Sequence, residues 1–87
     1  MGFYNVMFRK EPEGGYTAIV PSLPGCVTYG RSLELAKQHA EEAIELYIVS
    51  LKKHGESIPS DETSFFAPIR LNARTRSSST KRKAYAA

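Results

Sequence analysis

The hydrophobic pattern of the chain changes its period once, close to Gly30, and this limits the chain to a small mixed fold of strands and a helix. Before Gly30, apolar residues alternate with polar ones, as in strands. After Gly30 they recur at spacings of three and four, as in an amphipathic helix. The 87 residues make one domain. A domain of this size buries only about 60% of its unfolded surface, so we expect self-association or a partner to stabilise it.

Three short strands are predicted before the change of period, at residues 3–9, 16–20 and 26–30. Each has aromatic or β-branched residues at alternate positions. Residues 11–15 contain a proline and two glycines and predict a turn between the first two, antiparallel strands. Pro21, Pro24 and Gly25 predict a second turn, because proline lacks an amide donor and glycine tolerates a positive φ.

One long helix follows. Ser32 is the predicted N-cap, and Gly55 is the predicted first residue beyond the C-terminal cap. Between them lie about 21 residues at helical period. The apolar stripe expected to face the sheet consists of Ala36, Ala40, Ala43, Ile44, Tyr47 and Leu51.

Residues 64–71 are predicted to form a final strand, with Pro68 restricting it to a sheet edge. The predicted order is βββαβ: an α+β fold whose antiparallel-rich sheet of three to four strands carries one long helix on one face. Residues 1–71 are expected to form this domain, and residues 72–87 a basic, disordered tail. The other sheet face, with Phe3, Met7, Ile19 or their neighbours, would be uncovered, as at interaction surfaces.

Charge is divided along the chain. Up to Ile69 there are six basic and nine acidic residues, a net charge of −3, whereas from Arg70 onward there are six basic residues and no acidic one. An acidic body suits a basic partner, and a basic segment suits nucleic acid. The chain shows no membrane-length apolar run and no signal-peptide pattern at its start, so the expected location is the cytoplasm.

Catalytic chemistry is not expected, and neither is a metal or cofactor. Asp61 lies in a polar loop and is predicted to be a solvated turn residue. Cys26 has no local helix N-terminus that would lower its pKa and is predicted to be a small buried residue rather than a nucleophile. The remaining candidates lack the spacing of an acid–base pair or a zinc site; they are His39, Glu41, Glu42, Glu45 and His54.

The most specific segment is residues 15–32, Gly-Tyr-Thr-Ala-Ile-Val-Pro-Ser-Leu-Pro-Gly-Cys-Val-Thr-Tyr-Gly-Arg-Ser. A predicted helix rich in Glu and Ala follows it, and an Ile58-Pro59 pair follows the helix. Over residues 3–71 the sequence resembles the HicB family of antitoxins. The motif residues are Gly15, Tyr16, Pro21, Leu23, Pro24, Gly25 and Gly30. Physically, the proline-rich turn serves the architecture or contacts a partner directly, and the sequence leaves both open.

The resemblance implies a partial ribonuclease-H-like fold without ribonuclease activity. It also implies a HicA-like toxin as partner, which is a small basic ribonuclease that degrades mRNA, and a homodimer or higher homo-oligomer. The antitoxin would mask the active site of the toxin. Acidic residues that are candidates for facing the toxin are Glu11, Glu13, Glu41 and Glu45.

The chain departs from many family members at its C-terminal end. Those members continue into a helix-turn-helix or ribbon-helix-helix domain that binds DNA, and residues 72–87 are too few for either. The alternative function is a solitary HicB-like oligomer that binds nucleic acid through its basic residues, with affinity that falls as salt rises. These residues are Arg70, Arg74, Arg76, Lys81, Arg82 and Lys83. A residual nuclease is the least favoured reading.

Overall fold

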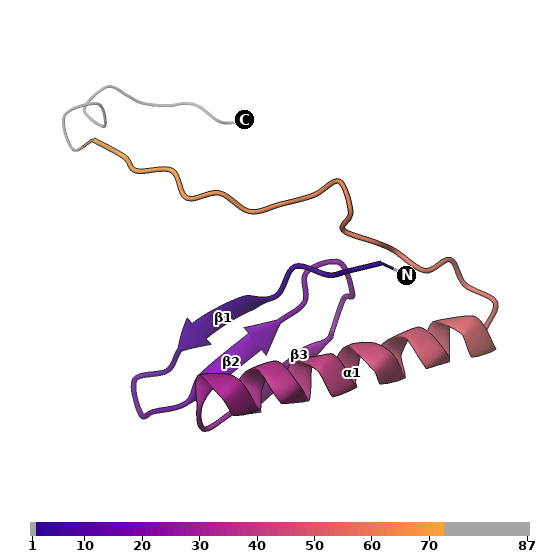
Figure 1. The fold of residues 1–87 in the computed structure, drawn as a ribbon, viewed down its shortest axis with the longest axis horizontal. Helices are drawn as coiled ribbons and strands as arrows, with labels where there is room; N and C mark the ends of the chain where they lie inside the picture. Colours follow the sequence, from indigo (N-terminus) through magenta and orange to yellow (C-terminus); the bar gives the residue numbers. More distant parts are fainter. Residues whose placement is uncertain (1, 73–87) are drawn as a thin grey trace.

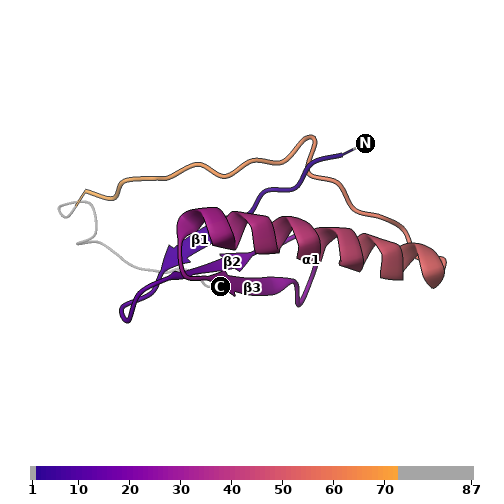
Figure 2. The same cartoon turned by 60° about the horizontal axis from the view of Figure 1, so that its bottom comes forward.

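The computed structural model describes residues 2–72. Three strands, β1 (Met7–Lys10), β2 (Tyr16–Ile19) and β3 (Val27–Gly30), precede one helix, α1 (Leu33–Lys53). The strands form an antiparallel sheet in the order β1-β2-β3. The helix crosses one face of this sheet (Figures 1 and 2). The predicted α+β fold is confirmed, while its ribonuclease-H-like character stays a prediction.

The register of the strands decides which residues face the helix. Phe8 of β1 and Thr28 of β3 lie opposite Ala18 of β2, whose side chain is completely buried. Because side chains alternate along a strand, the neighbouring row of Met7, Ile19 and Val27 points to the other face. The sheet therefore has one covered and one uncovered face, as predicted.

The turn between β1 and β2 depends on glycine. The amide of Glu11 donates to the carbonyl of Gly15 at 3.0 Å, and the amide of Gly14 donates back to the carbonyl of Glu11 at 3.0 Å. Gly15 has a φ of +85°, which L side chains rarely adopt. A Cβ at Gly15 would also meet the ring and hydroxyl of Tyr29, which would have to move. The backbone conformation and the neighbouring side chain therefore both favour glycine at this position.

Both ends of α1 are capped as predicted. The Ser32 hydroxyl accepts a hydrogen bond from the amide of Leu35 at 3.1 Å. At the other end Gly55 has a φ of +68°, and the amides of Gly55 and Glu56 donate to the carbonyls of Lys52 and Leu51. This is the Schellman arrangement, which satisfies carbonyls that the helix leaves unpaired.

The proline-rich turn encloses the centre of the core. Val20, Leu23 and Cys26 are all buried, and the amide of Cys26 donates to the carbonyl of Leu23 at 2.9 Å. The Tyr47 hydroxyl of α1 donates to the carbonyl of Pro24 at 2.8 Å. The residues that pack around this centre from outside are Tyr4, Val6, Ala43, Ile44, Tyr47 and Leu51. The motif thus has an architectural role. The burial of Cys26 is confirmed, and it raises the pKa of the thiol.

The predicted final strand is wrong for the single chain. Residues 64–71 form no strand, and Phe65, Ile69 and Leu71 are more than 80% exposed. After Ser64 the chain leaves the neighbourhood of the sheet in both views, so its backbone does not pair with β1 (Figures 1 and 2). Strand-forming residue types are present, but a strand also needs a neighbour within hydrogen-bonding distance.

The prediction of a solvated Asp61 is also wrong. Its side chain is only 4% exposed. Its carboxylate accepts hydrogen bonds from the Ser22 hydroxyl and, at 2.8 Å, from the amide of Asn5, while the Asp61 amide donates to the carbonyl of Phe3 at 3.1 Å. Asp61 therefore ties the proline-rich turn and the start of the chain to the segment that follows the helix.

Candidate protein-binding surface

The sheet face turned away from α1 is the candidate site, and we call it the open face. Side chains project from it at alternate positions of all three strands. Val27 is 56%, Tyr29 48% and Met7 40% exposed. The open face consists of Met7, Arg9, Thr17, Ile19, Val27 and Tyr29.

The open face is divided into two rows across the strands. Met7, Ile19 and Val27 lie opposite one another and form an apolar row. Arg9, Thr17 and Tyr29 form the next row, which is polar and aromatic. Protein interfaces commonly combine an apolar centre with a polar rim and are enriched in Tyr, Met and Arg. The composition of the open face fits such an interface.

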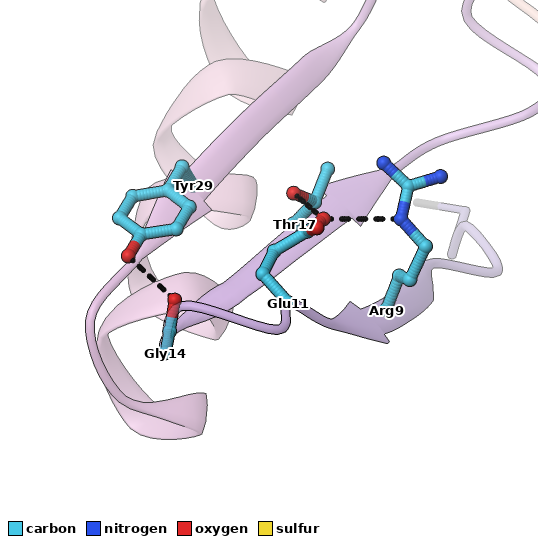
Figure 3. Close-up of polar contacts among 5 residues, drawn as sticks. All are labelled: Arg9, Glu11, Gly14, Thr17 and Tyr29. Atoms are coloured by element: carbon cyan, nitrogen blue, oxygen red, sulfur yellow. Dashed lines mark hydrogen bonds and ion pairs between the residues drawn. The ribbon is translucent and has the colours of Figure 1, made fainter.

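Hydrogen bonds organise the polar row (Figure 3). The carboxylate of Glu11 accepts from Nε of Arg9 at 3.0 Å and from the Thr17 hydroxyl at 2.5 Å. The Tyr29 hydroxyl donates to the carbonyl of Gly14 at 3.0 Å. The bond from Thr17, followed by that from Arg9, lowers the pKa of the Glu11 carboxyl below its ordinary value. Glu11 is thus a carboxylate held at the rim of the open face.

We predict that Glu11 titrates below the ordinary glutamate pKa of about 4.3. Because the folded pKa is lowered, the contribution of Glu11 to stability is complete above the unfolded pKa and is lost as the pH falls through the folded pKa. Thr17→Val removes the largest cause of the shift and should move the pKa back toward its ordinary value. The measurement is an NMR titration of the Glu11 side-chain carboxyl carbon in both proteins. Identical midpoints in the two would contradict this prediction.

The four candidate acidic residues do not form one patch. Glu11 and Glu13 belong to the β1–β2 turn, where Glu11 bonds to side chains of the open face. Glu41 and Glu45 lie on α1, exposed, and line a groove between the helix and the start of the chain. A single partner surface would therefore not meet all four through the open face.

The basic candidates fall almost entirely beyond the described residues. Arg70 is exposed. Arg74, Arg76, Lys81, Arg82 and Lys83 lie outside residues 2–72, and nucleic-acid binding through them stays a prediction.

Residues 2–72 contain no group of three or more His, Cys, Asp or Glu side chains placed to hold a metal ion. Nδ1 of His39 lies 2.6 Å from the carbonyl oxygen of Tyr29, and Nδ1 of His54 lies 2.8 Å from that of Ser50. Each histidine ring is therefore held by a backbone carbonyl. Within the same residues, α1 is too polar to span a membrane.

Comparison with known proteins decides the family. Residues 4–78 match the family described as HicB-like antitoxin of bacterial toxin–antitoxin system. The chain belongs to the HicB-like antitoxin family. A UPF0150 protein of Thermoplasma acidophilum is 48% identical over 58 residues, which cover 67% of this chain and 84% of the relative. A UPF0150 protein of Helicobacter pylori strain J99 is 42% identical over 67 residues, which cover 77% of this chain and 92% of the relative.

Membership of this HicB-like family confirms the resemblance seen in residues 3–71 and implies a toxin as partner. None of the six residues of the open face was among the predicted site residues, although Met7 and Ile19 were expected on an uncovered face of the sheet. The four that were not named at all are Arg9, Thr17, Val27 and Tyr29. Strand alternation would have grouped them, but only the register shows which of the two alternating sets the helix covers.

Proposed function

We propose that this chain is an antitoxin that binds a HicA-like ribonuclease in the cytoplasm and neutralises it by masking its active site. Two findings support the proposal: membership of the HicB-like antitoxin family, and the open face, which no element among residues 2–72 covers. The open face carries the proposal, because an exposed apolar row with an aromatic and charged border is typical of a protein-binding surface.

Charge supports the same partner. Residues 1–69 have six basic and nine acidic side chains. A net charge of −3 on this part of the chain favours contact with a basic ribonuclease over contact with acidic proteins, while the six basic residues from Arg70 onward bring the whole chain to +3. The attraction between exposed charges weakens at high salt, because the Debye length falls from about 10 Å at 0.1 M to about 3 Å at 1 M.

Inhibition of RNA cleavage tests the proposal. A HicA-like ribonuclease, produced from a reading frame adjacent to that of this chain, is incubated with a messenger RNA, and the chain is added in increasing amounts. We expect cleavage to stop near equal molar amounts, since each bound antitoxin covers one active site. A matched control uses an unrelated ribonuclease, whose activity should not change. Undiminished cleavage by the neighbouring enzyme at a tenfold excess of folded chain would contradict the proposal.

A further inference from the structure

Two unpartnered features of this chain match each other. The first, which we call the arm, is residues 65–71: an extended segment in which Phe65, Ile69 and Leu71 are 81%, 83% and 83% exposed. The second, which we call the β1 groove, lies between the start of the chain with β1 and the helix α1. Each exposes apolar surface that the other could cover.

The arm has the pattern of an edge strand. Alternate residues point to one side, and these are the apolar Phe65, Ala67, Ile69 and Leu71. Backbone amides alternate in the same way, so Pro68 belongs to the set that faces the opposite edge. The arm can therefore donate to a neighbouring strand along one edge, while the missing amide of Pro68 falls on the free edge.

The β1 groove has a volume of about 380 Å³ and a largely apolar lining. Tyr4, Val6 and Phe8 line it from the sheet side, and Ala40 and Ile44 line it from the helix. It is open because α1 packs mainly on β3 and β2, whereas β1 is the edge strand farthest from β3. The edge of β1 also has no strand neighbour on that side within residues 2–72.

The arm is directed away from the groove of its own chain. Nδ2 of Asn5 donates to the carbonyl of Ser64 at 2.8 Å, and this bond fixes the root of the arm beside the start of the chain. Beyond Ser64 the orange segment diverges from β1 in both views (Figures 1 and 2). Pro68 restricts Ala67 to extended conformations, which stiffens the arm along this course.

We propose that the arm of one copy pairs along β1 of a second copy, with its apolar side in the β1 groove, and that the two copies exchange arms about a two-fold axis. The largest fully buried side chains of the described residues are only Leu23 and Val20, so a single copy has a small core. Exchange buries apolar surface on both partners and covers an otherwise open strand edge. Seven extended residues span about 23 Å, enough to follow β1 and the residues before it.

This proposal is independent of the toxin, because the β1 groove and the open face lie on opposite faces of the sheet. It is tested on the full chain alone. In a Cys26→Ala background, one preparation carries Ile69→Cys in the arm and another carries Lys37→Cys at the β1 groove. The two are mixed and treated with a short reagent that joins two thiols, and the products are identified by mass spectrometry. The matched control replaces Lys37→Cys with Leu46→Cys, because Leu46 is 71% exposed and does not line the groove.

We expect Ile69→Cys to join Lys37→Cys of the other copy at least about tenfold more efficiently than it joins Leu46→Cys. Sedimentation should show a dimer of the unsubstituted chain, and Ile69→Asp should weaken its dissociation constant by about 10- to 100-fold. Arg70→Gln, on the opposite side of the arm, should change it by less than about threefold. Three results would overturn the proposal: a monomeric chain, a dimer whose dissociation constant is unchanged by Ile69→Asp, or a yield of the link between positions 69 and 37 no greater than that of the link between positions 69 and 46.

Discussion

Val27→Asp will weaken binding of the HicA-like toxin by about 30- to 1,000-fold, whereas Leu46→Asp will weaken it by less than about threefold. Val27 is 56% exposed, and it lies beside Ile19 in the apolar row of the open face. A toxin covering this row would bury the new carboxylate without a partner, at a cost of roughly 2–4 kcal/mol. Each 1.4 kcal/mol corresponds to a tenfold change in affinity.

Leu46→Asp is the matched control, because it also replaces an exposed apolar side chain with a carboxylate. Leu46 is 71% exposed and lies on α1, away from the open face. Affinities of both variants are measured by surface plasmon resonance on immobilised, inactive toxin. Thermal melting verifies that both are folded, since aspartate is also disfavoured in strands by up to about 1 kcal/mol. Equal losses in the two variants, or full affinity of a folded Val27→Asp chain, would show that the toxin does not bind through the open face.

Leu23→Ala will destabilise the fold by about 3 kcal/mol, the largest stability effect that we expect from removing a single side chain. Leu23 is completely buried between Val20 and Cys26. Truncation loses its transfer free energy and leaves a cavity, which together cost about 2.7–5 kcal/mol in comparable cores. A domain of this size has a total stability of roughly 4–13 kcal/mol, so a large fraction is lost.

Urea unfolding at fixed protein concentration measures this change, because dimer formation would make stability depend on concentration. Leu46→Ala is the control and should stay within about 0.5 kcal/mol of the unsubstituted chain. A loss below about 1 kcal/mol for Leu23→Ala would mean that the proline-rich turn is not a core element, and would leave partner contact as its role.

Local signals predicted most of the fold. Ser32 and Gly55 marked both ends of α1 because capping depends on residues within one turn. The turn glycines and prolines separated the strands for a similar reason. The identity of the covered sheet face did not follow, since Phe8 and Met7 are both apolar, and only the position of Phe8 opposite the buried Ala18 shows that Phe8 lies on the side of the helix.

Two wrong predictions concern contacts between distant parts of the chain; a third is the start of the first strand, which was expected at residue 3 and lies at Met7. Asp61 is buried by Asn5 and Ser22, which lie 56 and 39 residues away in sequence. Residues 64–71 have strand-forming side chains, but whether they pair with β1 depends on the direction that the backbone takes after Ser64. An uncovered sheet face was predicted from strand alternation and the presence of a single helix. The hydrogen bonds of Glu11 to Arg9 and Thr17 were not predicted, because they depend on the conformation of the β1–β2 turn.

The central claim is that this HicB-like chain binds a ribonuclease toxin. Isothermal titration of the full chain with the active-site-disabled product of the adjacent small reading frame tests it most directly. We predict tight binding at close to one toxin per chain, with a dissociation constant that increases as salt is raised from 0.1 to about 1 M. The absence of heat, together with the absence of a complex on size exclusion, would contradict the antitoxin function and direct attention to the basic residues after Ile69.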